Sequence, residues 1–525
     1  MKIVIFINAA HQHKYVDIVR AATSDISQIK VEYVDVSASG AGISMFIANK
    51  RSMFIANKRW TSKLLFAPIY LLRLFIPNHV LVKFTAYYHV FRRKYRPLIL
   101  KLRLKYTATL RRLRSNSYRF ITGPYRRFTS SASYLWFSFG VRKYISERVS
   151  LHYINSQVFS KDPDLLVFLE DNAEGLTGLA SYQARKRNIP YVILPDYIPN
   201  PAEPAQHYSN TLYHLADTIS GRLVKYVAPR WVFKFDGKNL LRLPPQVVFN
   251  QWLRGQTSIQ PWILNAGFAE IILLESKRSL RHYEKLGFLP QKLKIIGGAV
   301  EDTLYQVRQD YSSKREDLEK KYNLDPKKPL IICGFPPDQY SASTDNFEFP
   351  TYKEMCNNWF GILRKVSQKA NVIVVRHPRL DAEIIRPFAR GKFEIADENL
   401  ETILPLADLY VASISTTIRW ALALGIPVIN YDSYRYDYGD FNSAKGIREV
   451  DDIANFEAII NNTLGSTELT RLKGIARDDC ENWGNIDGNF SVRLREMLIA
   501  TEASFNGNTT PTHQLDYDLQ KNYEI

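Results

Sequence analysis

Four hydroxyl side chains lie in one short turn, where their spacing would let them bind an anion. The run Leu409 to Ala412 is typical of a buried strand, and it is followed by Ser413, Ser415, Thr416 and Thr417. At the carboxyl end of a parallel strand, hydroxyl groups and free backbone N–H groups face the crevice in which α/β proteins bind ligands. The turn therefore predicts a seat for the phosphate of a nucleotide, formed without a glycine-rich loop.

A histidine–proline pair is the second candidate for phosphate binding. It follows the apolar run Asn371 to Val375 in the order Arg376, His377, Pro378. Proline fixes the turn, so that the imidazole can donate to a phosphate, while the arginine raises the local positive potential. Taken alone, the pair is equally typical of a structural turn. Because it lies one βαβ unit before the hydroxyl turn, we expect the two groups to converge on one crevice.

Carboxylates in the N-terminal half are the candidates for a general base. Glu170 and Asp171 follow a predicted buried strand, Asp164 to Leu169. Like charges so close together should raise one pKa, which suits a base that deprotonates an attacking hydroxyl. The alternative is that Asp171 or Asn172 caps the next helix, and both roles are compatible. His11, in the loop after the first strand, is another base candidate or a solvated loop histidine.

A glycine turn and the absence of metal motifs complete the candidate chemistry. Gly297 and Gly298 follow the strand-like run Lys294 to Ile296, so a ligand could approach their backbone closely, or the turn is an ordinary tight one. Asp162 and Asp164 have the spacing of a metal motif but precede their strand. We therefore predict no metal site and no cofactor besides a nucleotide-activated co-substrate. Three cysteines in 525 residues indicate a reducing compartment.

The net charge of +18 comes from one segment. Residues 36–146 contain 22 Lys and Arg and no Asp or Glu, so the rest of the chain is slightly acidic. In residues 60–130 these cations alternate with long apolar and aromatic runs, and Arg73 and Pro77 interrupt the longest run before it could span a bilayer. A basic, aromatic-rich helical segment is typical of one that lies on an anionic membrane. The cations proposed to contact the membrane are Arg92, Arg93, Lys94, Arg111, Arg112 and Arg114.

Two alternatives to membrane docking remain open for this segment. It could be a helical subdomain whose cations face water, or it could bind RNA. Large aliphatic side chains accompany the cations, whereas nucleic-acid grooves chiefly need cations and isolated aromatics, so we predict no nucleic-acid partner.

Strand and helix signals alternate on both sides of the basic segment, which predicts an α/β chain with two Rossmann-like, doubly wound domains. The polar stretch Asp325 to Pro329 is the predicted hinge. The expected divisions are 1–44 and 151–322 for the N-terminal, acceptor-side domain, 45–150 for the basic helical insertion, 323–465 for the nucleotide-binding domain, 466–502 for C-terminal helices and 503–525 for a disordered tail.

The chain resembles the GT-B glycosyltransferase superfamily over roughly residues 160–460. The segment from Tyr283 to Gly287, followed by Ile296 to Asp302, resembles the G-x-x-x-D region of CDP-glycerol glycerophosphotransferases. Arg376 to Arg379, with Ala407-Asp408, the hydroxyl turn and Gly425 to Pro427, looks like their C-terminal core. The combination is also similar to bacterial sialyltransferases and Kdo-transferases, with Asn172 standing where their acidic motif has glycine.

This resemblance implies that His377 and Ser415 to Thr417 hold the donor phosphate, that Glu170 or Asp171 is the base, and that no bound metal is needed. The expected function is transfer of a sugar or polyol phosphate from a nucleotide-activated donor to a surface glycan or lipid-linked acceptor. The expected location is the cytoplasm, peripherally on the inner face of the cell membrane. The alternatives are an enzyme like the UDP-sugar 2-epimerases and a non-catalytic scaffold for polysaccharide assembly.

Overall fold

The structure is a computed structural model, and it describes most of the chain outside the basic segment. The described residues are 1–7, 10–36, 132–173, 175–194, 199–209, 211–255, 260–340, 347–378, 380–389 and 393–507. Contacts divide the chain into two compact units, Met1–Ser37 with Ile154–Ile525 and Ala38–Tyr153. Of the smaller unit, only the part of α6 (Ala132–Gln157) up to residue 153 is described. The six cations predicted to contact a membrane, Arg92 to Arg114, lie outside the described residues.

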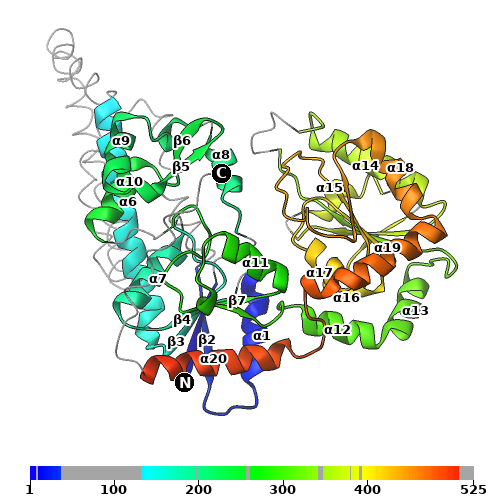
Figure 1. Cartoon of the computed structure of the whole chain (residues 1–525), viewed down its shortest axis with the longest axis horizontal. Coiled ribbons are helices and arrows are strands. Elements are labelled where there is room, and N and C mark those ends of the chain that lie inside the picture. Colours follow the sequence, from blue (N-terminus) through cyan, green and yellow to red (C-terminus); the bar gives the residue numbers. More distant parts are fainter. Residues whose placement is uncertain are drawn as a thin grey trace, which may run out of the picture. The chain divides into compact units, whose positions relative to one another are not determined.

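Six parallel strands form the first sheet, in the order β2-β1-β3-β4-β7-β8 (Figure 1). The central strands β1, β3, β4 and β7 are apolar runs buried on both faces, as parallel strands between helices require, whereas the edge strands β2 and β8 are partly exposed. The strands are β1 (Lys2–Ile7), β2 (Lys30–Asp35), β3 (Leu165–Phe168), β4 (Tyr191–Ile193), β7 (Ile271–Leu274) and β8 (Leu293–Ile295). The helices of this part are η1 (Ala10–His13), α1 (Lys14–Thr23), η2 (Phe159–Lys161), α7 (Leu176–Lys186), α8 (Ala202–Tyr208), η3 (Leu212–His214), α9 (Ile219–Val227), η4 (Pro229–Trp231), α10 (Pro245–Leu253), α11 (Lys277–Lys285) and η5 (Pro290–Lys292).

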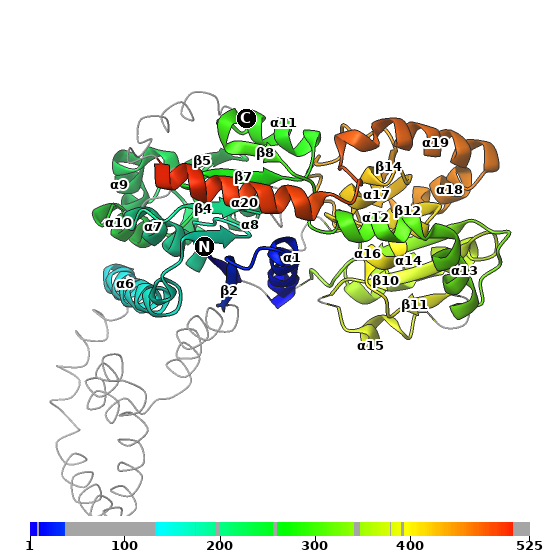
Figure 2. The same ribbon diagram turned by 90° about the horizontal axis from the view of Figure 1, so that it is seen from below.

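The last helix of the described residues, α20 (Phe490–Gly507), packs on this first sheet (Figure 2). Phe490 and Leu494 share a buried cluster with Val19 of α1 and Ile5 of β1. The helix therefore supplies part of a core whose strands lie several hundred residues earlier in the chain. It also continues to Gly507, past residue 503, where the sequence predicted the tail to begin.

A small antiparallel hairpin lies in the chain between η4 and α10. Its strands are β5 (Val232–Phe235) and β6 (Lys238–Leu241). The two residues between them, Asp236 and Gly237, both have positive φ, of 48° and 69°. Asp-Gly with two positive φ angles is the signal of a two-residue type I′ hairpin, because this turn matches the twist of the strands.

The second sheet also has six parallel strands, in the order β11-β10-β9-β12-β13-β14. Its strands are β9 (Leu330–Phe335), β10 (Asn371–Arg376), β11 (Glu394–Ala396), β12 (Leu409–Ala412), β13 (Val428–Tyr431) and β14 (Ile447–Val450). Its helices are α12 (Glu301–Gln309), α13 (Tyr311–Lys321), α14 (Tyr352–Val366), α15 (Ala382–Ile385), α16 (Leu400–Ile403), η6 (Leu404–Leu406), α17 (Ile418–Ala423), α18 (Ile453–Thr463), α19 (Ser466–Asp479) and η7 (Cys480–Asn482).

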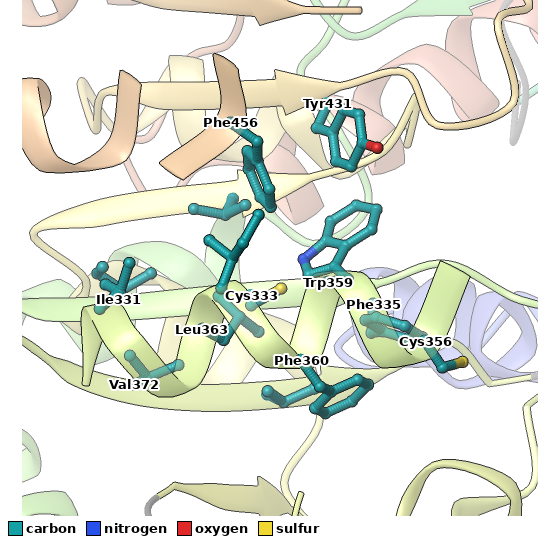
Figure 3. Close-up of a cluster of buried hydrophobic side chains, with 14 of the residues drawn as sticks. Ile331, Cys333, Phe335, Cys356, Trp359, Phe360, Leu363, Val372, Tyr431 and Phe456 are labelled. Carbon is teal, nitrogen blue, oxygen red and sulfur yellow. The ribbon is translucent and has the colours of Figure 1, made fainter. Parts of the chain in front are cut away.

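Helices bury both faces of this second sheet. Side chains alternate along a strand, so Ile331 faces α14 and α18 whereas its neighbour Ile332 faces α12, α16 and α17. On the first of these faces, Trp359 lies against Tyr431 and Phe456, with ring centroids 4.8 and 5.3 Å away (Figure 3). Two parallel sheets of this kind confirm the predicted fold class, α/β with two Rossmann-like doubly wound domains.

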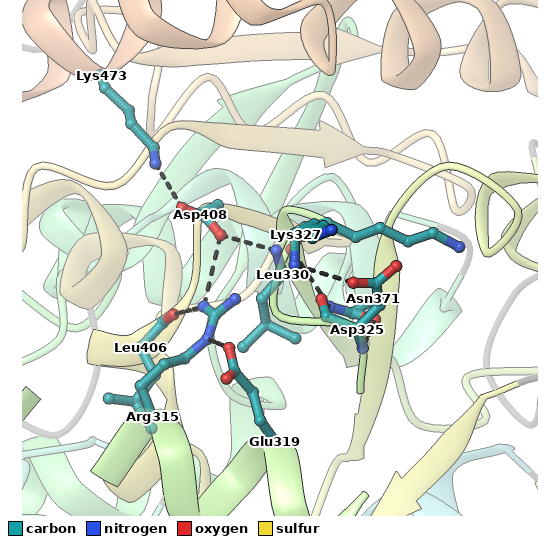
Figure 4. Close-up of polar contacts among 10 residues, drawn as sticks. Arg315, Glu319, Asp325, Lys327, Leu330, Asn371, Leu406, Asp408 and Lys473 are labelled. Carbon is teal, nitrogen blue, oxygen red and sulfur yellow. Dashed lines mark hydrogen bonds and ion pairs between the residues drawn. The ribbon is translucent and has the colours of Figure 1, made fainter. Parts of the chain in front are cut away.

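Asp408 joins several elements at the amino end of β12 (Figure 4). Its carboxylate accepts from Lys473 Nζ at 2.5 Å and from the Leu330 N–H at 2.7 Å, and Arg315 Nη1 lies 3.4 Å away. It therefore ties α13 and α19 to the starts of β9 and β12. The candidate site lies at the opposite, carboxyl edge of the sheet, so the structure gives Asp408 a structural role.

Candidate functional site

The hydroxyl turn lies where the strand order of the second sheet reverses. From β9 the chain moves outward to β10 and β11, and it then returns to begin β12 on the other side of β9. In open α/β sheets, ligands bind beyond the carboxyl ends of the strands at such a switch point. Ala412, the last residue of β12, pairs with Gly334 near the end of β9. The turn that begins at Ser413 therefore stands at the switch point, at the carboxyl end of a parallel strand where the sequence placed it.

This turn holds a strained residue. Ile414 has a φ of +37°, a region that β-branched residues rarely occupy. Its N–H donates to Asn430 Oδ1 at 2.8 Å, and Asn430 Nδ2 in turn donates to Glu449 Oε2 at 2.7 Å. Asn430 is only 5% exposed, so the side chain that holds the turn is buried and its two hydrogen bonds are partly buried. Backbone strain fixed in this way is concentrated at binding and catalytic sites.

Replacing Asn430 by alanine should release this turn. The Ile414 N–H and the Glu449 carboxylate would both lose a shielded partner, so we expect the free energy of unfolding to fall by about 1–3 kcal/mol. Urea unfolding followed by tryptophan fluorescence measures the loss. Glu449→Gln keeps an acceptor for Asn430 and should change stability much less. Equal losses in the two variants would contradict this account of the turn.

Three hydroxyls form a chain that leaves one proton to donate. Tyr410 OH lies 2.6 Å from Thr417 Oγ1, which lies 2.8 Å from Ser415 Oγ. Tyr410 is fully buried, and Gly334 makes room for its hydroxyl, because a Cβ there would come within 2.3 Å of it. If the tyrosine donates to Thr417 and Thr417 to Ser415, the Ser415 proton is left over. The half-exposed Ser415 can therefore donate to a ligand.

The other two hydroxyls of the turn differ in exposure. Thr416 is exposed, and its carbonyl accepts from Arg419 Nε at 3.3 Å. Ser413 is buried, and its Oγ has no hydrogen-bond partner among the described residues. A buried hydroxyl without a partner is costly unless another group satisfies it. Within the described part of the chain, the hydroxyls of Ser413 and Thr416 thus form no hydrogen bond with the protein, and both could donate to a ligand.

The helix after the turn is short. α17 spans only Ile418–Ala423, and no side chain caps its start. Six residues align few peptide dipoles, so the helix adds little attraction for an anion. The hydroxyls and nearby arginines must supply most of it.

His377 lies at the same edge of the sheet, one strand away from the hydroxyl turn. β10 and β12 both pair with β9, so their ends are separated by two strand spacings, roughly 10 Å. The His377 N–H donates to the Phe335 carbonyl at 3.2 Å, and Pro378 follows in an exposed turn. Arg376 Nη1 donates to the Leu380 carbonyl at 2.9 Å, which turns this guanidinium toward its own loop.

The base candidates share the corresponding edge of the first sheet. That sheet reverses its strand order between β1 and β3. Glu170 and Asp171 follow β3, and both are buried. His11 follows β1 within η1, and its side chain lies outside the described residues. The fold therefore brings the backbone of all three candidates to one switch point.

Asp171 has a raised pKa, but for a different reason from the one predicted. Its carboxylate accepts from Ser181 Oγ at 3.2 Å and from Tyr191 OH at 3.0 Å. Burial raises its pKa to about 6, although these hydrogen bonds oppose the shift. The predicted cause, repulsion from the adjacent Glu170, is wrong. The helix-cap alternative is also wrong, because Gly175 is the N-cap of α7 and no side chain caps it.

The glycine turn accommodates a carboxylate of the protein itself. Gly297 has a φ of +97°, and a Cβ there would lie 2.3 Å from Glu301 Oε2. A Cβ on Gly298 would lie 3.4 Å from the other Glu301 oxygen. Burial raises the pKa of Glu301 to about 8, with nearby Glu275 adding to the effect. The close approach that glycine allows here is therefore to Glu301.

A charged pocket near the turn escaped the sequence reasoning. Arg419 of α17 forms an ion pair with Glu275, which follows β7, and both side chains are largely buried. Burial and Glu203 raise the pKa of Asp440 to about 6, whereas Arg419 and Arg278 oppose this. An arginine within an otherwise apolar helix was the available signal. The pocket is lined by Pro199, Leu274, Glu275, Ser276, Arg278, Ser279, His282, Tyr283, Arg419, Asp440 and Trp483.

A neighbouring pocket of about 290 Å³ is strongly basic. Arg278, Arg281 and Lys285 reach it from one face of α11, and Lys445 reaches it from the segment before β14. Burial and the adjacent Arg281 lower the pKa of Arg278, an effect that Asp440 opposes, and Asp479 is the one carboxylate among the described lining residues. Such a pocket suits a phosphate or another anionic group.

The described residues contain neither a cluster of metal ligands nor a membrane-spanning helix. No group of three or more His, Cys, Asp or Glu side chains there could hold a metal ion. No helix in the same part of the chain is long and apolar enough to cross a membrane.

Comparison with known proteins gives matches of structure only. No family model matches the chain, and no curated protein matches it in sequence. Among solved structures, the wall teichoic acid polymerase TagF is 10% identical, with 65% of this chain and 74% of that chain covered and a TM-score of 0.40. The UDP-GlcNAc 2-epimerase from Neisseria meningitidis, bound to UDP-GlcNAc, is 10% identical. The match covers 95% of this chain and 100% of that chain, with a TM-score of 0.45. S. aureus MnaA with UDP is also 10% identical. The match covers 97% of this chain and 98% of that chain, with a TM-score of 0.47.

Proposed function

We propose that this chain is a membrane-associated transferase. It moves a sugar or polyol phosphate from a nucleotide-activated donor to a hydroxyl of a surface glycan or lipid-linked acceptor. The observation on which this depends is the hydroxyl turn at the switch point of the second sheet. There the hydroxyl chain from Tyr410 through Thr417 can leave the Ser415 proton to donate, and the strained Ile414 is held by a hydrogen bond to the buried Asn430.

Arginines near the turn supply charge for the donor phosphate. Arg419 contacts the backbone of Thr416 and lines the charged pocket, and Arg278 lines both that pocket and the basic one. Donors fixed in advance around a departing phosphate stabilise the charge that develops on it. In this proposal the phosphate lies between the Ser415 hydroxyl and these guanidinium groups, with His377 at the far side of β9.

The first sheet supplies the base. The acceptor hydroxyl attacks the transferred group, Glu170 or Asp171 takes the hydroxyl proton, and the nucleotide leaves with the bonding electron pair. With a pKa raised to about 6, Asp171 is ionised at neutral pH and still basic enough to accept a proton. Its two hydrogen-bond donors, Ser181 and Tyr191, would fix the direction of the carboxylate.

Nucleotide binding is the direct test of this proposal. We expect one of CMP, CDP, UDP or GDP to raise the melting temperature of the protein. Calorimetry with that nucleotide should then show binding weakened about 10- to 100-fold when Ser415 and Thr417 both become alanine, because the one bond that Ser415 would donate to a charged oxygen contributes about 1.5–3 kcal/mol. His377→Ala should also weaken binding.

Thr470→Val is the matched control, since this exposed hydroxyl bonds only to its own helix. Failure of all four nucleotides to stabilise the protein would contradict the proposal. So would conversion of UDP-N-acetylglucosamine to its 2-epimer without an acceptor, because an epimerase needs no second substrate.

A further inference from the structure

Helix α9 exposes an apolar face to solvent. Ile219, Leu223 and Tyr226 follow the i, i+4, i+7 spacing that places side chains on one face of a helix. They are 93%, 50% and 86% exposed. The opposite face, with Gly221 and Val224, is buried against α10 and the elements around it. Among the described residues, the core on this side is thus complete without the exposed face.

Large apolar side chains are also exposed on the neighbouring elements. They lie in η3, which precedes α9, and at the end of α10, which packs against α9. Exposed apolar residues scattered singly are normal, whereas a group of them marks a surface that binds a partner or a membrane. The additional side chains are Leu212, Tyr213, Trp252 and Leu253.

The charge around this apolar face is positive. Residues 211–255 contain seven Lys and Arg but only two Asp and Glu. Arg222 and Lys225 are exposed on α9 itself, next to the apolar stripe. An apolar stripe flanked by cations, with aromatic residues among the apolar ones, is the pattern of helices that lie in the interface of an anionic bilayer.

We propose that the α9 face, defined by Ile219, Leu223 and Tyr226, docks on an anionic lipid surface. The apolar side chains enter the boundary between headgroups and acyl chains, and Arg222 and Lys225 bind lipid phosphates. The net positive charge favours this occupant over a second copy of the chain, whose own α9 face would repel it. The α9 face belongs to a different part of the sequence from the basic segment at residues 36–146. This proposal goes beyond the proposed transfer reaction, because docking on a membrane needs no nucleotide-activated donor.

A dye on α9 reports its own insertion, whatever other parts of the chain bind. Ile219→Cys in a Cys480→Ser background carries an environment-sensitive NBD label, while the buried Cys333 and Cys356 stay unlabelled. With vesicles of phosphatidylcholine and phosphatidylglycerol, we expect brighter, blue-shifted emission. The matched control is a label at Ile384→Cys, which is 47% exposed on α15 and should not respond. An unchanged α9 spectrum overturns the proposal.

Two further outcomes are decisive. A blue shift that rises with protein concentration in the absence of vesicles means self-association, and it overturns the proposal. Replacing Ile219, Leu223 and Tyr226 by serine should weaken vesicle binding by roughly tenfold or more, because each side chain loses apolar burial. The same change at Ile384 and Ile499 should have no effect. Nucleotide binding is measured without lipid, so failure of docking and failure of the proposed function are distinguishable.

Discussion

Replacing Asp408 by alanine should lower the free energy of unfolding by about 2–4 kcal/mol, measured by urea unfolding. Two cations, Lys473 and Arg315, would lose their shared carboxylate, and the Leu330 N–H would lose its acceptor. Removing one partner of a buried ion pair typically costs about 3–5 kcal/mol. The expected loss is smaller here because the Lys473 side chain is 29% exposed, so water can solvate part of its charge.

Asp408→Asn provides the graded control for this prediction. Its amide oxygen can still accept from the Leu330 N–H but carries no charge for the two cations, so its stability should lie between those of the wild type and the alanine variant. Glu316→Ala removes an exposed pair with Lys320 and should have almost no effect. If Asp408→Ala is no worse than Glu316→Ala, the cluster in Figure 4 does not hold the sheet together.

Replacing Glu301 by glutamine should stabilise the protein at pH 8 but not at pH 5. Burial, with a contribution from Glu275, raises the pKa of Glu301 from 4.5 to about 8 in the folded chain. The folded state therefore keeps a proton that the unfolded chain releases near pH 4.5, and stability falls as pH rises between these values. Glutamine stays neutral at every pH, so it avoids this loss, which we expect to reach a few kcal/mol at pH 8.

Melting temperatures of the two proteins across pH 5 to 9 measure this difference. The curves should nearly coincide up to about pH 5 and separate progressively above it, with the Glu301→Gln variant melting higher. Glu284→Gln, at an exposed position of α11, is the control and should follow the wild type throughout. Parallel curves for Glu301→Gln and the wild type would show that Glu301 does not titrate in this range.

The sequence predicted the central strands of both sheets because these strands are buried on both faces. Such strands are continuous apolar runs, as in Ile271 to Leu274, which forms β7. The short strand β11, with only Ile395 and Ala396 as apolar residues, offers no comparable signal. The β5–β6 hairpin was not predicted, although Asp236-Gly237 is a strong turn signal. The predicted fold contained parallel strands only, and this pair is antiparallel.

The candidate site was predictable only as far as strand ends define it. Ser413 and His377 could be placed at one edge because both follow buried strands, but their spacing depends on β9 lying between β10 and β12. The ion pair between Glu275 and Arg419 joins residues far apart in the chain, and no local pattern reveals such a contact. The pKa of Asp171 likewise depends on burial, which cannot be deduced from the neighbouring residues in the sequence.

The return of α20 to the first sheet has a consequence for how this protein is made. A nascent chain leaves the ribosome amino end first, so β1 and α1 emerge long before Phe490, Leu494 and Leu498, which complete their core. The first domain must wait for almost the whole chain to be synthesised, whereas the second sheet is fully available earlier. We therefore expect the carboxyl-terminal domain to reach its native state first, reversing the usual order of translation-coupled folding.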